Sequence, residues 1–330
     1  MVDFEVANAR LQDLLDRVGS PRPVSADEPL YCGLDVGTAF IVLAVVDAAG
    51  EPVACAYRFA SVVKDGMVVD YMGAVDIARE LKEELEQQLG RELEPCAVAL
   101  PPGTEGLDGG VVKNVAEGAG LDVVAVFDEP TAANLLIGAR DGAVVDIGGG
   151  TTEVAVISLG GIVTSSSLRL AGNRLDEAIA MHLRDLLGIK IGERTAEVIK
   201  IKIGSILPFE DGRERDMIIS GQDVLTEQPK EVTIQSEDVR EALQEPIDEM
   251  VVHIKETFKK TNPDLASDII SNGILLTGGG GLLSGLDRYL TNKLEIPVWT
   301  SETALTNVVT GCLKVLETPA ALKQILMRSK

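Results

Sequence analysis

Two short stretches of this sequence combine aspartate with glycine in a way that could bind phosphate and a metal ion: Asp35-Val36-Gly37-Thr38 and Asp146-Ile147-Gly148-Gly149. Backbone amides can surround a phosphate only where no side chain blocks the approach, and glycine meets that need. Gly150 and Thr151 extend the second turn. The aspartates supply the carboxylate oxygens that Mg²⁺ prefers beside phosphates. Such turns are also common connectors, so the nucleotide interpretation depends on finding two of them in equivalent settings.

A third glycine-rich stretch follows a short apolar run. Ile274-Leu275-Leu276 leads through Thr277 into Gly278, Gly279 and Gly280. A backbone without side chains could lie there against an adenosine and its α-phosphate. The spacing is neither the dinucleotide-binding GxGxxG nor the Walker Gly-Lys-Ser/Thr, which disfavours both of those folds. A structural tight turn is the alternative for this run.

Glu129 is the candidate catalytic residue. It follows Asp128 at the end of a strand-like run, and Pro130 fits the first turn of the helix that begins there. A carboxylate at this point could orient a water molecule for in-line attack on a γ-phosphate. The alternative is an ordinary charge at a helix terminus. A small-molecule kinase would need an aspartate base beside a substrate pocket, and Asp128 is the only nearby candidate.

The charge balance narrows the possible partners. With 52 acidic against 30 basic residues, the 330-residue chain has a net charge of −22, which repels phosphate backbones and anionic lipid surfaces. No apolar stretch reaches the roughly 18 residues of a membrane span, and the first residues do not form a signal peptide. We therefore expect a cytoplasmic protein with no nucleic-acid partner and no stable membrane anchor. The four cysteines match no zinc spacing, which predicts buried thiols.

The order of the predicted elements indicates an α/β protein with an internal duplication. A strand, an Asp-X-Gly turn and two further strands occur from residue 31 to 59 and again from residue 143 to 168. Apolar periodicity predicts helices at 3–18 (amphipathic), 73–89, 111–120, 130–136, 173–187 and 194–206, and from 236 and 286. Strands are predicted at 96–100, 123–127 and 274–276, with a small β-rich insert at 217–234. Residues 19–29, with three prolines, are predicted to be a linker.

These motifs together resemble the actin/Hsp70/sugar-kinase superfamily from about residue 30 onward. Residues 1–145 resemble the J-type, Hsp70-like protein of ethanolamine utilisation, through 34–38, 58–66 and 128–133. Residues 146–330 resemble MreB, the bacterial actin of rod shape, through 146–157, 191–197 and 275–280. The chain therefore reads as a hybrid of the two, natural or constructed, joined near the second phosphate turn.

The resemblance implies an actin-like ATPase fold, in which two duplicated ribonuclease-H-like domains surround a nucleotide cleft. The first domain would comprise residues 30–145 and about 305–330, after an N-terminal helix and linker at 1–29. The second would comprise residues 146–304, with the small β insert at about 205–235. The segment that follows the first three strands is shorter than in MreB, so we expect a reduced small subdomain in the first domain.

The resemblance also implies ligands and roles for individual residues. ATP and Mg²⁺ are the implied ligands, with Asp35 and Asp146 at the metal and Glu129 positioning water. Further contacts are implied at Gly172 and Asn173, near the phosphates, and at Glu197 and Lys200, against the adenosine.

Two functions remain open from the sequence. The first is a slow, polymerising actin-like ATPase that forms cytoskeletal or scaffold filaments in a cell-shape role. The alternative is an Hsp70-like, ATP-dependent chaperone or reactivation factor linked to ethanolamine-utilisation microcompartments. A reduced small subdomain would lack part of the contact that MreB uses in filaments. An acidic N-terminal helix replaces the basic, apolar membrane helix of MreB, which disfavours attachment to a membrane.

Overall fold

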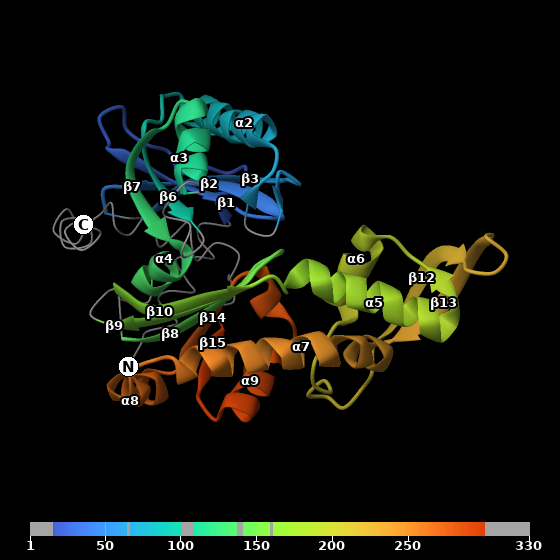
Figure 1. Cartoon of the computed structure of the whole chain (residues 1–330). Coiled ribbons are helices and arrows are strands. Elements are labelled where there is room, and N and C mark those ends of the chain that lie inside the picture. Colours follow the sequence, from blue (N-terminus) through green and yellow to red (C-terminus); the bar gives the residue numbers. More distant parts are fainter. Residues whose placement is uncertain are drawn as a thin grey trace.

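The computed structural model describes residues 16–49, 51–64, 67–100, 109–136, 141–158 and 161–300. The predicted helix at 3–18, apart from its last three residues, and the segment 305–330 assigned to the first domain lie outside these ranges. Two five-stranded sheets form the centre of the described part (Figure 1).

The first sheet has the strand order β3-β2-β1-β6-β7. Three strands form the predicted antiparallel meander, and two join them in parallel. In chain order the strands are β1 (Leu30–Val36), β2 (Phe40–Asp47), β3 (Pro52–Phe59), β6 (Pro95–Leu100) and β7 (Asp122–Asp128). Helices α2 (Tyr71–Leu89) and α3 (Gly109–Gly118) cover one face of this sheet (Figure 1).

The second sheet repeats this plan, with the order β10-β9-β8-β14-β15. Its first three strands again form an antiparallel meander, and the last two again join in parallel. The strands are β8 (Gly142–Ile147), β9 (Thr152–Ser158), β10 (Gly161–Leu168), β14 (Ile274–Thr277) and β15 (Val298–Thr300). The duplication predicted from the sequence is therefore confirmed at the level of strand order and direction.

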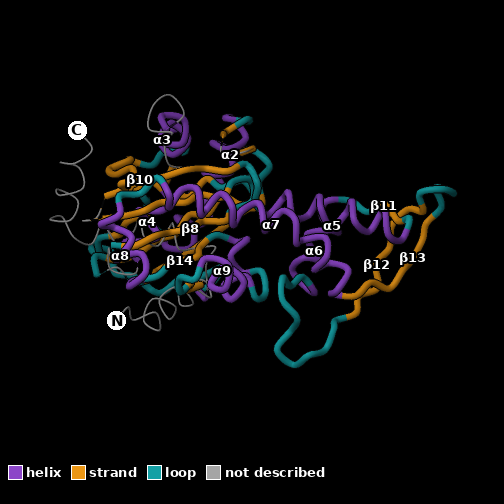
Figure 2. The backbone as a smooth tube through the Cα atoms, turned by 60° about the horizontal axis from the view of Figure 1, so that its bottom comes forward, coloured by secondary structure: helices purple, strands orange, loops and turns teal. Residues whose placement is uncertain are grey.

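The remaining elements lie between the sheets or extend from the second one. The helices are α4 (Glu129–Leu136), α5 (Gly172–Leu187), α6 (Glu193–Ile203), α7 (Ser236–Lys259), α8 (Pro263–Asn272) and α9 (Leu286–Leu294), with a short 3₁₀ turn η1 (Gly279–Leu282). The predicted β insert is a three-stranded sheet of β11 (Ile189–Lys190), β12 (Asp216–Asp223) and β13 (Pro229–Gln235). Figure 2 shows that this small sheet, with α5 and α6, projects away from the two large sheets.

Local chemistry explains where several helices begin and end. The side chain of Asp70 accepts the backbone N–H of Gly73 at the start of α2, and Gly90 ends that helix with φ 69°, which favours glycine. Gly188, with φ 62°, ends α5 in the same way. The predicted helix at 194–206 stops at Ile203, because the chain leaves the helical conformation at Gly204.

Each large sheet has its own apolar core. Leu34, Leu43 and Leu81 are fully buried where the first sheet meets α2. Ile147, Leu175 and Ile179 are fully buried between the second sheet and α5. Burial of this kind stabilises each half.

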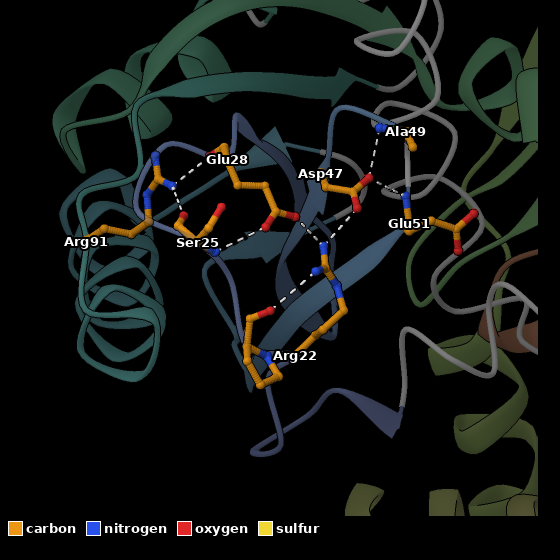
Figure 3. Close-up of polar contacts among 8 residues, drawn as sticks. Arg22, Ser25, Glu28, Asp47, Ala49, Glu51 and Arg91 are labelled. Carbon is orange, nitrogen blue, oxygen red and sulfur yellow. Dashed lines mark hydrogen bonds and ion pairs between the residues drawn. The ribbon is translucent and has the colours of Figure 1, made fainter.

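A polar clamp holds the chain from Arg22 to Glu28 against the first sheet, so the predicted linker is anchored. Figure 3 shows the Arg22 guanidinium donating to Glu28 and to Asp47, at 2.6 and 2.8 Å. The Arg91 guanidinium donates to the backbone carbonyl of Glu28 at 2.6 Å. The backbone N–H of Arg22 also donates to the carbonyl of Val53 at 2.8 Å, which fixes the segment beside β3.

The segment after β3 is short, as expected from the sequence. It forms a two-stranded hairpin of two-residue strands, β4 (Val63–Lys64) and β5 (Met67–Val68), before α2 begins. That the small subdomain of the first half is reduced relative to MreB stays a prediction.

Candidate functional site

The two Asp-X-Gly turns are closed by the same hydrogen bond. The N–H of Gly37 donates to the carbonyl of Phe40, and the N–H of Gly148 donates to the carbonyl of Thr151, both at 3.0 Å. These two amides are therefore used within their turns and are not available to a phosphate. Within the described ranges, the amides of Thr38, Gly149 and Gly150 donate to no backbone carbonyl.

The fold brings the two turns into contact. A Cβ atom built on Gly149 would lie 3.3 Å from Cβ of Thr38 and 3.6 Å from the backbone nitrogen of Ala39. A side chain at 149 would therefore crowd the contact between the turns, which glycine avoids. Backbone amides with no side chain beside them, as at Gly149 and Gly150, can bind phosphate oxygens.

The start of α5 lies against the second turn. The N–H of Gly172 donates to the carbonyl of Gly148 at 3.0 Å, and the N–H of Asn173 donates to the carbonyl of Gly149 at 2.8 Å. Both residues thus lie beside the second Asp-X-Gly turn, and their contact with phosphates stays a prediction. Their amides support the turn instead of facing an anion, which the sequence could not reveal.

Lys200 ties α6 to this same point. Its Nζ atom donates to the carbonyl of Gly172 and to the carboxylate of Asp176, both at 2.9 Å. Burial raises the pKa of Asp176 to about 6, although Lys200 acts in the opposite direction. Glu197, half-buried one turn earlier on α6, also raises that pKa through its charge. Lys200 and Glu197 are therefore close to the turn, and Lys200 already has protein partners.

The third glycine stretch also packs against the second turn, at Asp146 and Ile147. Gly278 has φ 80°, and a Cβ atom there would lie 2.6 Å from Oδ1 of Asp146 and would collide with the carbonyl of Ile147. A Cβ atom on Gly280 would collide with the Ile147 side chain, and Gly279 begins η1 between them. The structure thus gives this run a packing reason for glycine, as the tight-turn alternative expected.

The two aspartates lie at the centre of the site. Burial raises the pKa of Asp35 to about 6. Asp146 is 5 % exposed, and burial together with the charge of Asp35 raises its pKa to about 7. Within the described residues, Oδ2 of Asp146 has no hydrogen-bond partner. Two carboxyls that oppose each other's ionisation, one of them with an oxygen that no donor reaches, fit the binding of a divalent cation.

Glu129 is the first residue of α4, the helix that follows the last strand of the first sheet and precedes the first strand of the second sheet along the chain. The neighbouring Asp128 caps this helix, because its Oδ1 accepts the backbone N–H of Thr131 at 2.7 Å. Burial raises the pKa of Glu129 well above its usual range, and the charges of Glu153 and Asp35 raise it further. Glu129 therefore belongs to the same acidic centre, whereas Asp128 has a structural role.

Glu153 is a further carboxyl beside Asp146, and it was not predicted from the sequence. It lies on β9 directly opposite Asp146 in the antiparallel register, and it is only 1 % exposed. Burial raises the pKa of Glu153 well above its usual range, and the charge of Asp146 adds to this effect. The signal in the sequence is a carboxylate inside an otherwise apolar strand, which a strand with one solvent-facing side could equally explain.

The arrangement can bind a phosphate chain and hold a cation, and it can place a carboxyl near the terminal phosphate. No group of three or more ligating side chains within the described ranges is arranged to hold a metal ion alone. The aspartates would therefore share a cation with phosphate oxygens and water, as Mg²⁺ usually requires.

A family model and a curated protein that match this chain both belong to MreB. The family model described as "MreB/Mbl protein" matches residues 55–324. The cell shape-determining protein MreB of Escherichia coli K12 is 40% identical over 260 residues, which are 77% of this chain and 74% of that protein.

Two solved structures extend the likeness. A crystal structure of MreB5 of Spiroplasma citri bound to ADP has 28% identity and a TM-score of 0.77, and covers 90% of this chain and 98% of its own. A crystal structure of the ethanolamine utilisation protein EutJ from Carboxydothermus hydrogenoformans has 32% identity and a TM-score of 0.74, and covers 94% and 99%. The actin-like ATPase fold is thus confirmed. The similarity to MreB is not confined to residues 146–330, because the family model already matches from residue 55. The similarity to EutJ likewise covers 94% of this chain, and so both halves of it.

In the part of the chain that the structure describes, no helix is both long and apolar enough to cross a membrane.

Proposed function

Because the chain belongs to the MreB/Mbl family, we propose that it binds ATP between its two sheets, hydrolyses it slowly and assembles into cytoskeletal filaments. The observation that carries this proposal is the contact between the two phosphate turns, where Gly149 lies beside Thr38. ADP is the ligand of the MreB5 structure that this chain resembles.

The residues of the site have separable tasks in this proposal. The amides of Thr38, Gly149 and Gly150, with the hydroxyl of Thr151, bind the phosphate chain between the turns. Asp35 and Asp146 would hold Mg²⁺, which would supply positive charge beside the phosphate oxygens. Gly278 and Gly280 let the third glycine stretch approach β8 closely enough to form one wall of the site.

Glu129 would act on the attacking water. In hydrolysis, the water oxygen forms a bond to the γ-phosphorus, and the bond from that phosphorus to the β–γ bridging oxygen breaks. The Glu129 carboxylate orients the water and accepts its proton, so that ADP and inorganic phosphate leave. Slow turnover suits a protein in which bound ATP favours assembly and hydrolysis later favours release.

The filament proposal rests on the family and on the relatives named for cell shape. A cytoplasmic location accompanies it, with a cell-shape or scaffold role. Sedimentation and negative-stain electron microscopy with ATP and Mg²⁺ test it directly. We expect pelletable filaments, and a monodisperse monomer at high protein concentration would contradict assembly.

Glu129→Gln tests the catalytic assignment separately. This variant removes the proton acceptor but keeps the size of the side chain, so ATP should still bind. Phosphate release should fall about 100-fold or more. Unchanged turnover would remove Glu129 from the reaction.

A chaperone or reactivation factor for ethanolamine-utilisation microcompartments is the second candidate. The specific observations in its favour are the likeness to EutJ over nearly the whole chain and the short β4–β5 hairpin. This candidate predicts ATP binding and turnover without filaments. The sedimentation experiment therefore distinguishes the two functions in one preparation.

A further inference from the structure

Asp176 and Lys200 form an ion pair in the second half of the molecule, and the proposed function gives neither residue a task. Both carboxylate oxygens of Asp176 lie 2.9 Å from Nζ of Lys200. The side chain of Asp176 is 8 % exposed and that of Lys200 is 15 % exposed. Two apolar side chains of similar size would often stabilise such a place equally well. The charges therefore point to a task other than stability.

The Lys200 ammonium lies beside the second Asp-X-Gly turn. It donates to the carbonyl of Gly172 at 2.9 Å, and the N–H of Gly172 donates to the carbonyl of Gly148 at 3.0 Å. A Cβ atom built on Gly172 would lie 3.4 Å from Nζ of Lys200 and 3.6 Å from Cα of Gly149. A positive charge is thus held next to the backbone that would bind phosphate.

The ammonium is held from one side and keeps a donor for a ligand. Gly172 and Asp176 are four residues apart on α5, so they lie on the same face of that helix. An ammonium carries three N–H groups. Among the described contacts, the hydrogen bonds to the Gly172 carbonyl and to Oδ2 of Asp176 use two of them. The third N–H can meet an anion at the turn.

We propose that Asp176 is a positioning residue, whose carboxylate holds the Lys200 ammonium so that its third N–H donates to a phosphate oxygen of the bound nucleotide. The proposal rests on nucleotide binding between the two turns, as described above. It assigns Lys200 to the phosphate chain and not to the adenosine, because the ammonium lies against the turn. Without Asp176, the long Lys200 side chain would have to be ordered when the nucleotide binds, which costs affinity.

A double-mutant cycle in the full chain tests the positioning role. Its variants are Asp176→Leu, Lys200→Met and the two combined, and Asp176→Asn is the conservative variant. Lys202→Met, at an exposed position of the same helix, is the matched control. Calorimetric titration with ADP and Mg²⁺ measures Kd, and thermal unfolding without nucleotide measures Tm.

Asp176→Leu and Lys200→Met should each weaken ADP binding about 10- to 100-fold. The combined variant should bind ADP no more weakly than Lys200→Met alone, since the two residues act as one unit. Asp176→Asn should lose less affinity, because its amide oxygen still accepts from Lys200. The combined variant should have a higher Tm than Asp176→Leu, because it no longer buries an unpaired ammonium. Lys202→Met should bind ADP as the wild type does.

Phosphorus NMR of the bound ADP, at saturating concentration, tests the phosphate contact itself. Lys200→Met should shift a phosphorus resonance that Lys202→Met leaves in place. Unchanged resonances in Lys200→Met would overturn the contact to phosphate. Wild-type ADP affinity in Asp176→Leu, or a multiplicative loss in the combined variant, would overturn the positioning role and leave the pair as a structural link between α5 and α6.

These outcomes are distinguishable from a failure of the proposed function. A wild-type chain that does not bind ADP would reject both. A wild-type chain that binds ADP with an affinity independent of Asp176 would reject the positioning role alone.

Discussion

The two large sheets share their strand order, yet they surround their aspartates differently. In the first sheet, Asp35 faces Val42 across the antiparallel pair. In the second, Asp146 lies between Glu153 and Thr277, in register with both. The repeated plan supplies two Asp-X-Gly turns, but only the second copy places a glutamate and a threonine in register with its aspartate. One duplicated scaffold therefore carries different side chains around its two aspartates.

The strongest test of this asymmetry compares Asp146→Asn with Asp35→Asn. Each variant loses one of the proposed carboxylate ligands of Mg²⁺, so phosphate release should fall about 100-fold or more. Asp146→Asn should lower phosphate release more than Asp35→Asn, because Thr277 and Glu153 lie in register with Asp146 and hold its side chain in place. Phosphate release against Mg²⁺ concentration measures both, with Asp211→Asn in the remote β insert as the control. A larger loss for Asp35→Asn would reverse the proposed order.

A change at the contact between the turns tests whether both copies face one ligand. Gly149→Val places a side chain where Cβ of Thr38 is 3.3 Å from the position of the new Cβ. ATP affinity should fall about 10- to 100-fold, measured by calorimetric titration. Gly110→Ala on α3 is the matched control, because a Cβ atom there meets nothing within 4 Å. Equal affinities for both variants would place ATP elsewhere.

The pH dependence of stability sharpens the difference between the aspartates. Burial raises the pKa of Asp146 to about 7 and that of Asp35 to about 6, so the folded protein without ligands binds these protons more tightly than the unfolded chain. The stabilising contribution is fully present below about pH 4 and is lost as the pH rises through 6 and 7. Thermal unfolding without Mg²⁺ should therefore show Tm falling over this window.

Asp146→Asn should remove more of that pH dependence than Asp35→Asn, because its pKa shift is larger. Added Mg²⁺ should restore stability at pH 7 and above, since the cation favours the ionised carboxylates. A flat Tm between pH 4 and pH 7 would contradict the buried environment of both aspartates.

The smallest expected effect concerns the clamp on the first sheet. Arg22→Ala removes hydrogen bonds to Glu28 and Asp47 and should cost about 1–2 kcal/mol of unfolding free energy. Arg58→Ala, whose pair with Glu84 is more exposed, is the control and should cost about 0.5 kcal/mol or less. Chemical denaturation measures both. Equal costs would mean that the clamp contributes no more than an ordinary surface pair.

Much of the fold could be predicted from the sequence because its signals are local. The Asp-X-Gly turns, the two meanders and the β insert each depend on a few consecutive residues, and the repeated order revealed the duplication. The clamp could not be predicted in this way. Arg22 and Asp47 are 25 positions apart, and nothing in the proline-containing segment indicates which acid the arginine meets.

The candidate site was predicted in part for the same reason. Asp35, Asp146 and Glu129 follow from turn and helix signals, and the structure brings them together. The amides of Gly172 and Asn173 donate to the carbonyls of Gly148 and Gly149. These bonds depend on how α5 packs against the second turn, which no short stretch of sequence indicates. The burial of Glu153 depends on packing over both faces of β9, so a single glutamate in an apolar run could not be told from a surface residue.

A crystal structure with AMPPNP and Mg²⁺ would locate the nucleotide and the metal ion. We expect the phosphate chain between Thr38 and Gly149, with the metal ion beside Asp35 and Asp146. A nucleotide bound away from these two turns, or a metal ion without contact to either aspartate directly or through water, would contradict it.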